Sequence, residues 1–235
     1  MPRFGGGWMH QFGHVYALQQ ELLSQTRVDW FHAAELWHTA RHEGLALNSA
    51  HYTNILRQCV RPAQWQQALV VLRQMRRDAI RPDVVGVACA MASCAEAGQW
   101  QAGLAVFHRF EPVMQLDSQC YVAAMRCCNS AAQWNMTLEM GERQHAAHVP
   151  MLPATYVPLL EACDWADDAD KALAYVRQLS EERWPLLAKG AMAAKRLCVR
   201  HGRDAEYTAI CGPLTTEALE PLCMDRAPLA VRASN

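Results

Sequence analysis

The chain has 235 residues, of which 51% are hydrophobic and 19% are charged. This composition can supply a buried core and excludes a chain that is disordered throughout. Lysine and arginine number 22 against 23 aspartates and glutamates, so the net charge of −1 excludes a uniformly basic nucleic-acid coat. No apolar run approaches the length of about 18 residues that predicts a membrane span, so we expect no membrane contact.

The N-terminal segment precedes any regular pattern. Residues 1–13 include the run Gly5-Gly6-Gly7, and we expect a flexible lead or the remnant of a targeting segment there. The ten cysteines of the chain form no CxxC pair. In a chain of this length they favour a reducing compartment over a disulfide framework.

Two ladders of residues reveal an internal repeat of about 35 residues. One is made of tryptophan and the other of cysteine, and they run in the same phase, which predicts six units followed by a tail at 223–235. The tryptophans are Trp30, Trp65, Trp100 and Trp134, and the cysteines are Cys59, Cys94, Cys128, Cys163 and Cys198. The units span 14–48, 49–83, 84–117, 118–152, 153–187 and 188–222.

Each unit has the pattern of two amphipathic helices joined by a short turn. In unit 49–83, apolar residues recur at helical spacing before and after the breaker Arg61-Pro62. No segment alternates with period two, so we expect no strands. A single helix pair cannot bury its apolar stripe, but stacked pairs can. The sequence therefore predicts an all-α, right-handed α-solenoid of about six helix-turn-helix units over 14–222.

Three segments of the second unit resemble the pentatricopeptide repeat. His-Tyr-Thr-Asn-Ile-Leu at 51–56 is similar to the opening of the repeat. The segment 64–75 is similar to its second helix, and Ile-Arg-Pro-Asp at 80–83 is similar to its closing motif. Unit three repeats the second-helix pattern at 97–107. The resemblance covers roughly residues 14–210.

The resemblance implies single-stranded RNA binding in an organelle, with one base read by each repeat. In the family, the residue after the first-helix tyrosine and the last residue of the repeat face the base. Thr53 and Asp83 would form one such pair and favour guanine by family analogy. Asn48 and Asp117 are further polar candidates, each paired with an aliphatic residue. A pair that is aliphatic at both positions cannot hydrogen-bond a base. The other pairs are Leu18 with Asn48, Ala88 with Asp117, Val122 with Leu152, and Val157 with Leu187.

Positive charge is concentrated in two places. Unit 49–83 has six arginines against two aspartates, and a second group of basic residues lies in unit 188–222. The acidic stretch from Asp164 to Asp170 separates them and would repel phosphates. We therefore expect two local contact points for RNA or protein. The candidate phosphate contacts are Arg57, Arg61, Arg81, Lys195, Arg196 and Arg200.

By resemblance, the leading hypothesis is a non-catalytic, mitochondrial protein without a cofactor or a small-molecule substrate. It would bind single-stranded RNA or rRNA, or be a subunit or assembly factor of a mitochondrial ribonucleoprotein such as the mitochondrial ribosome. The alternative is a protein–protein scaffold that has lost base reading. The aliphatic pairs and the near-zero net charge favour that alternative.

A third hypothesis, metal-dependent hydrolysis, has little support in the sequence. The histidines His10/His14 and His38/His42 have metal-ligand spacing, but neither pair has a convincing third ligand. The aspartates at 164, 167, 168 and 170 could bind Mg²⁺, although capping of a helix explains them better. The tryptophan ladder predicts packing at the start of the second helices rather than base stacking, and the cysteine ladder predicts small buried residues. Motifs of nucleotide-binding loops, serine hydrolases and zinc deaminases are absent from the sequence.

Overall fold

The computed structural model describes residues 30–61 and 63–211, and it is helical throughout this part of the chain. No strand occurs among these residues, which confirms the all-α prediction. The segments 1–29 and 212–235 lie outside the described residues, as do Leu18, His10, His14, the lead 1–13 and the tail 223–235. The helices are α2 (Trp30–His42), α3 (Ser49–Val60), α4 (Trp65–Arg77), α5 (Val84–Glu96), α6 (Trp100–Phe110), α7 (Ser118–Ser130), α8 (Trp134–Ala146), α9 (Pro153–Ala166), α10 (Ala169–Glu181), α11 (Ala188–Arg200) and α12 (Asp204–Cys211).

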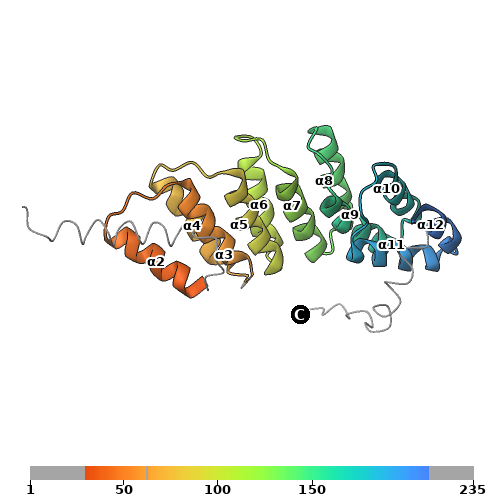
Figure 1. The fold of residues 1–235 in the computed structure, drawn as a ribbon, viewed down its shortest axis with the longest axis horizontal. Coiled ribbons are helices and arrows are strands. Elements are labelled where there is room, and N and C mark those ends of the chain that lie inside the picture. Colours follow the sequence, from red (N-terminus) through yellow and green to blue (C-terminus); the bar gives the residue numbers. More distant parts are fainter. Residues whose placement is uncertain (1–29, 62, 212–235) are drawn as a thin grey trace, which may run out of the picture. The chain divides into compact units, whose positions relative to one another are not determined.

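The helices form two compact units, described here separately (Figure 1). In the first unit, which ends at Ala131, α3 packs against α4 and α5, and α5 packs in turn against α6 and α7. In the second unit, α9 packs against α8, α10 and α11. Within each unit, first helices of successive repeats therefore contact each other, as expected for stacked helix pairs. The boundary divides the predicted unit 118–152 between α7 and α8.

The cysteine ladder forms part of the core. All five ladder cysteines are completely buried, which confirms the sequence prediction. Burial raises the pKa of Cys59 to about 12, and burial together with nearby Asp168 raises that of Cys163 to about 12 as well. Thiols with such pKa values stay protonated at neutral pH, so they act as small apolar residues rather than as nucleophiles.

The tryptophan ladder marks helix starts. Trp65, Trp100 and Trp134 are the first residues of α4, α6 and α8, as the sequence predicts. Each is partly buried. The indole rings thus contribute to packing at the start of the second helices while retaining some exposed surface.

The turns between helices repeat one hydrogen-bonding scheme. After α5, Gly98 adopts a φ of 68°, and the Gln99 amide donates back to the Cys94 carbonyl at 2.9 Å. After α4, Ala79 has a φ of 54°, and the Ile80 amide donates to the Met75 carbonyl at 2.8 Å. This arrangement is a Schellman motif, which satisfies carbonyls that a helix end leaves without partners.

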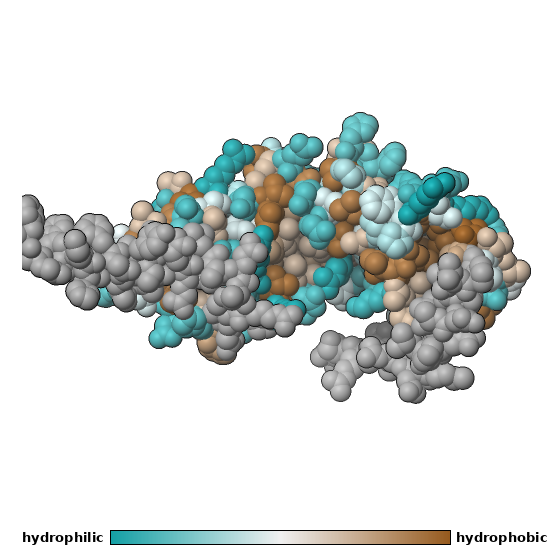
Figure 2. Space-filling view, viewed as in Figure 1, coloured by the Kyte–Doolittle hydropathy of each residue, from teal (hydrophilic) through white to brown (hydrophobic). Residues whose placement is uncertain are grey.

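The surface mixes apolar and polar side chains. Figure 2 shows brown and teal side chains interspersed over the helix pairs. Several large apolar side chains are exposed, including Val113 at 60% and Trp165 at 57%. Among the described residues, no helix combines the length and hydrophobicity that a membrane crossing needs.

Candidate nucleic-acid interface

Thr53 and Asp83 lie together at the junction of α3 and α5. The Thr53 hydroxyl donates to Asp83 Oδ1 at 2.8 Å, across 30 residues of sequence. The same oxygen accepts the Gly86 amide at 2.7 Å and so caps the N-terminus of α5. Asp83 Oδ2 has no hydrogen-bond partner among the described residues. Because Thr53 is only 5% exposed and Asp83 is half-buried, the carboxylate is the part of the pair that a ligand can reach.

Gly86 permits this close arrangement. A Cβ atom at Gly86 would lie 2.9 Å from Asp83 Oδ1 and 3.2 Å from Thr53 Oγ1. A side chain there would therefore push against the pair. The sequence of the α5 N-terminus, Asp-Val-Val-Gly, places an N-cap acceptor and a small residue at the positions that the pair needs.

Two arginines continue along α3 from Thr53. Arg57 lies within α3 and Arg61 is its C-cap residue with helical backbone angles, and the intervals of four residues place all three on one side of the helix. Both guanidinium groups are exposed, and no carboxylate among the described residues pairs with them. Arg57 Nη1 lies 3.5 Å from Asn54 Oδ1, one turn earlier on α3. Burial raises the pKa of the Cys89 thiol, and the positive charge of Arg57 acts in the opposite direction.

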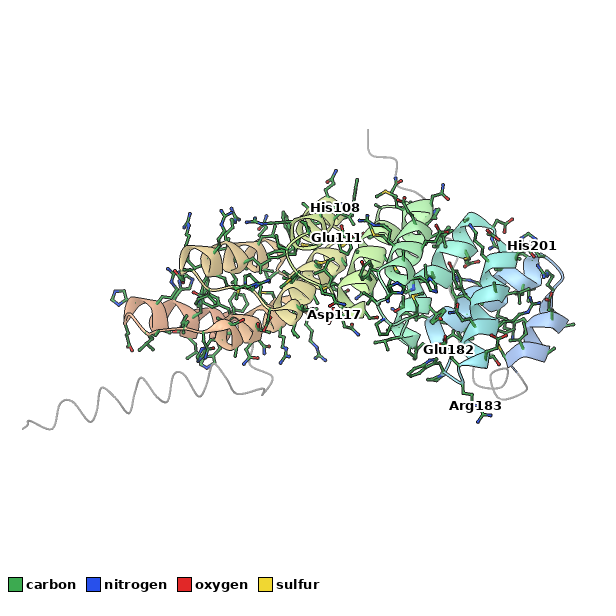
Figure 3. The ribbon with its side chains drawn as sticks, turned by 90° about the horizontal axis from the view of Figure 1, so that it is seen from above. His108, Glu111, Asp117, Glu182, Arg183 and His201 are labelled. Carbon is green, nitrogen blue, oxygen red and sulfur yellow. The ribbon has the colours of Figure 1, made fainter. Side chains whose placement is uncertain are left out.

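Asn48 and Asp117 occupy N-cap positions like that of Asp83. Asn48 Oδ1 accepts the His51 amide at 3.2 Å, and His51 Nδ1 accepts the Asn48 amide at 3.1 Å, forming a capping box on α3. Asp117 Oδ1 accepts the Cys120 amide at 3.0 Å at the start of α7. In Figure 3, Asp117 lies beyond the end of α6, where His108 and Glu111 are close to each other. Because Ala88 stands where α3 has Thr53, no hydroxyl accompanies Asp117.

Arg81 belongs to a different surface from Arg57 and Arg61. It lies in the loop between α4 and α5, where its guanidinium donates to the Val113 carbonyl at 3.0 Å. There it lines a groove between α4 and α6, to which no residue of α3 contributes. The structure thus brings two of the three arginines of this predicted cluster together on α3 and places the third elsewhere.

The second predicted basic cluster is compensated by acid. Arg196 donates to Asp164 Oδ2 at 2.6 Å, and Arg200 contacts Asp164 Oδ1 at 2.5 Å. The Asp164 side chain is only 9% exposed, whereas both guanidinium groups are more than half exposed. Lys195, the third member of this cluster, is partly buried on α11. An arginine that forms an ion pair with a buried carboxylate attracts a phosphate less strongly than an arginine without an acidic partner.

The aspartates of 164–170 have distinct local roles. Asp168 caps α10 by accepting the Lys171 amide at 3.0 Å, which confirms helix capping for this residue. Asp167 ends α9 with a φ of 58° and contacts His201 at 3.0 Å. Asp164 lies within α9, where it binds the two arginines. Across residues 30–61 and 63–211, no group of three or more His, Cys, Asp or Glu side chains could hold a metal ion, and His38 and His42 are exposed.

The second unit contains an aromatic pair that the ladder did not predict. Trp134 stacks on Trp165 with ring centroids 5.4 Å apart and planes inclined by 9°. Trp134 begins α8, and Trp165 lies near the end of α9. Trp165 stands outside the ladder, so periodicity alone could not indicate it. In the sequence, Trp165 follows Trp134 by close to one repeat length, and this spacing was the signal from which the pair could have been predicted.

No protein-family model and no curated protein matches the sequence. Solved structures do match the fold. The PPR domain of Arabidopsis thaliana protein-only RNase P 1 (PRORP1), in complex with tRNA, superimposes with a TM-score of 0.63 at 13% identity, covering 80% of this chain and 97% of that one. The pentatricopeptide repeat protein PPR10 from maize, in complex with an 18-nt psaJ RNA element, gives a TM-score of 0.62 at 11% identity, covering 81% of this chain and 28% of that one.

Nuclear proteinaceous RNase P 2 (PRORP2) from A. thaliana gives a TM-score of 0.60 at 19% identity, covering 71% of this chain and 38% of that one. The chain thus spans well under half the length of PRORP2 and of PPR10. At these identities the likeness concerns the fold, and it agrees with the repeat motifs at 51–56 and 80–83. The chain therefore has the fold of the pentatricopeptide repeat proteins.

Proposed function

We propose that the first unit binds single-stranded RNA and reads one base at the Thr53–Asp83 pair. The observation that carries this proposal is the Asp83 carboxylate, held in place by two hydrogen bonds through Oδ1 and open at Oδ2. Exposed Arg57 and Arg61 follow on the same side of α3. This arrangement combines an oriented acceptor for a base edge with positive charge for the backbone. The RNA-bound structures of PPR10 and PRORP1 support binding of RNA by this fold.

Guanine is the base that suits the pair best. Its Watson–Crick edge presents two neighbouring N–H donors, and both can point at Oδ2, the carboxylate oxygen that is not used by Thr53 and Gly86. Adenine and cytosine present an acceptor on that edge, which the carboxylate would repel. A well-made bidentate contact discriminates between bases by ~1–3 kcal/mol. The pairs Val122 with Leu152 and Val157 with Leu187 have no comparable groups, so we expect specificity at one position rather than along a tract.

The test replaces Asp83 with asparagine. Asparagine is also a good N-cap and still accepts from Thr53, so the Asp83→Asn variant should remain folded. With its oxygen in the place of Asp83 Oδ1, the carboxamide presents its NH2 group to the base, which complements the N1 acceptor of adenine and repels the two donors of guanine. Fluorescence anisotropy with the full chain would compare polyuridine RNAs that carry one central guanine or one central adenine. Asp117→Asn is the matched control, because it changes an N-cap aspartate that lacks a threonine partner.

We expect wild-type protein to bind the guanine RNA about tenfold more tightly than the adenine RNA, which equals about 1.4 kcal/mol. Asp83→Asn should abolish or reverse that preference, and Asp117→Asn should leave it unchanged. Equal affinities of wild type for the two RNAs would contradict base reading. An equal change of guanine preference in the two variants would contradict the assignment of base reading to Asp83.

The proposed cellular role is non-catalytic, in a mitochondrial ribonucleoprotein such as the ribosome or one of its assembly intermediates. It is supported by the resemblance of 49–83 to the pentatricopeptide repeat and by the absence of catalytic motifs from the sequence. Crosslinking and pull-down from isolated mitochondria would test it. A short RNA footprint with few proteins would indicate an RNA-processing factor, whereas recovery of a whole particle would indicate a structural subunit. Absence of the protein from mitochondria would contradict the localisation.

A further inference from the structure

A groove of about 580 Å³ lies between the second helices α4 and α6 of the first unit. Its floor is aliphatic apart from Phe110, and its rim carries four arginines. We call the apolar lining the floor and the arginines the rim; the rim arginines come from α4, the α4–α5 loop and α6. The floor residues include Leu69, Leu72, Ile80, Pro82, Val106 and Phe110, and the rim residues are Arg73, Arg76, Arg81 and Arg109.

The four rim arginines have no acidic partner among the described residues. Arg73 bonds to the Leu69 carbonyl at 3.2 Å, and Arg81 bonds to the Val113 carbonyl. Arg109 lies over the Phe110 ring at 5.9 Å from its centroid. All four guanidinium groups are exposed. The groove therefore combines an apolar floor with positive charge that nothing in this part of the protein compensates.

We infer that this groove binds an acidic amphipathic helix of a partner protein. A helix can pack its apolar stripe between two other helices, as in ridges-into-grooves packing. Helix-in-groove recognition uses apolar anchor residues that are three and four positions apart on the bound helix. Glutamates and aspartates beside that stripe would meet the arginine rim, and arginine is enriched in well-packed protein interfaces. The groove shares no residue with the RNA site, because neither α3 nor Asp83 lines it, although Arg81 and Pro82 adjoin Asp83 in the loop between α4 and α5.

The chemistry of the groove favours a helix over two other ligands. RNA would bring phosphates, but its bases need planar faces to stack on, and the floor is mainly aliphatic. A small anionic amphiphile has one charged head and would engage one or two of the arginines. Arg73 and Arg76 lie three residues apart on α4, about 4.5 Å along its axis, which matches carboxylates one turn apart on a partner helix.

The second unit has a cavity that serves as an internal contrast. It measures about 430 Å³ and lies beside α8 and α10, where His145, Gln178 and Glu182 line it together with apolar residues. No arginine lines it, and Glu182 would repel an acidic helix. An acidic segment should therefore select the α4–α6 groove over this cavity.

The test uses a synthetic helix as probe. A fluorescein-labelled peptide of about 20 residues, about 30 Å long as a helix, would carry one leucine stripe flanked by glutamates. A second peptide with lysine in place of glutamate is the charge control. Anisotropy titrations would use the full chain as wild type, Arg76→Glu/Arg109→Glu, Ala105→Trp and Arg57→Glu/Arg61→Glu. Ala105 lines the groove and is exposed, so tryptophan fills the groove without changing its charge.

We expect the acidic peptide to bind wild type at least tenfold more tightly than the lysine peptide. Arg76→Glu/Arg109→Glu should reverse this preference, so a gain for the lysine peptide separates charge reversal from misfolding. Ala105→Trp should weaken binding about tenfold, and the α3 control should leave it unchanged. Equal binding of the two peptides, equal loss in the α3 control, or displacement of the peptide by single-stranded RNA would each overturn the inference. Loss of guanine preference in Asp83→Asn bears only on the RNA proposal.

Discussion

The two units differ in whether carboxylates compensate their arginines. In the second unit, Arg196 and Arg200 share Asp164, while Arg177 and Arg203 contact Glu206. In the first unit, Arg41 and Arg126 have acidic partners, but the arginines of α3 and of the α4–α6 groove have none among the described residues. Arginines with similar exposure are thus structural in one unit and available for ligands in the other. Whether an arginine lacks an acidic partner therefore indicates a binding surface better than the net charge of its surroundings does.

Two glycines between helices, one in each unit, differ in the room that they leave for a side chain. A Cβ on Gly103 would lie 2.4 Å from Cys127 Sγ, and Cys127 is completely buried. A Cβ on Gly190 would lie 3.1 Å from Leu160 Cδ1, the end of a flexible side chain. Alanine favours the helix by about 1 kcal/mol at both positions, so the clash decides the result.

We therefore expect Gly103→Ala to reduce the free energy of unfolding by about 2 kcal/mol, within the usual cost of overpacking. Gly190→Ala should change it by less than about 0.5 kcal/mol, because the leucine can move and the helix gains propensity. Urea denaturation followed by circular dichroism would measure both. A loss in Gly190→Ala as large as that in Gly103→Ala would show that the helices are equally tightly spaced at these two positions.

The ion-pair contrast can be changed directly at Asp164. Asp164→Asn removes the charge that binds Arg196 and Arg200. Loss of a buried partner is costly, but both guanidinium groups are more than half exposed and can return to water. We expect a loss of about 1–2 kcal/mol in unfolding free energy, together with a gain in RNA affinity at low salt. The control is Asp168→Asn, which keeps an N-cap oxygen on α10 and whose aspartate pairs with Lys171 rather than with Arg196 or Arg200. An unchanged RNA affinity in Asp164→Asn would contradict the contrast.

Equivalent tyrosines in the two units provide a smaller contrast. The Tyr52 hydroxyl donates to Asp78, whereas the buried Tyr156 hydroxyl has no hydrogen-bond partner within the described part of the chain. We expect Tyr52→Phe to reduce the free energy of unfolding by about 1 kcal/mol and Tyr156→Phe to leave it unchanged or raise it slightly. Thermal denaturation of both variants would measure the difference. A matching loss in Tyr156→Phe would contradict the assignment of its hydroxyl as unpaired.

The Tyr52 effect should depend on pH. Burial and the hydrogen bond to Asp78 raise the pKa of Tyr52 to about 12. Burial acts to raise the pKa of Asp78, but hydrogen bonds from Tyr52 and Gln74 and the charge of Arg41 outweigh it, and the net shift is downward. A carboxyl with a lowered pKa stabilises the fold above its unfolded pKa of about 4, and that contribution is lost as pH falls through the folded pKa. The difference between wild type and Tyr52→Phe should therefore shrink in acid and persist at neutral pH.

Much of the fold follows from the sequence, because the pattern of each helix pair recurs in several successive repeats. The ladders placed the starts of α4, α6 and α8 correctly, and the repeat register brought Thr53 to Asp83. The ion pairs of Asp164 were harder to predict, because they join adjacent repeats rather than residues within one. Arg196 and Asp164 are 32 residues apart, so charges summed unit by unit could not reveal that one compensates the other. The rim of the α4–α6 groove escaped prediction for the same reason, since Arg76 and Arg109 come from different repeats.

The central claim is that uncompensated arginines on α3 contact RNA and compensated arginines on α11 do not. The most direct measurement is the salt dependence of RNA affinity for wild type, Arg57→Gln/Arg61→Gln and Arg196→Gln/Arg200→Gln. Each phosphate contact on a single strand contributes about −0.7 to the slope of log affinity against log salt. We expect the slope to become shallower by about 1.4 in the α3 variant and to stay unchanged in the α11 variant. Equal changes in both variants, or a change in the α11 variant alone, would contradict the account.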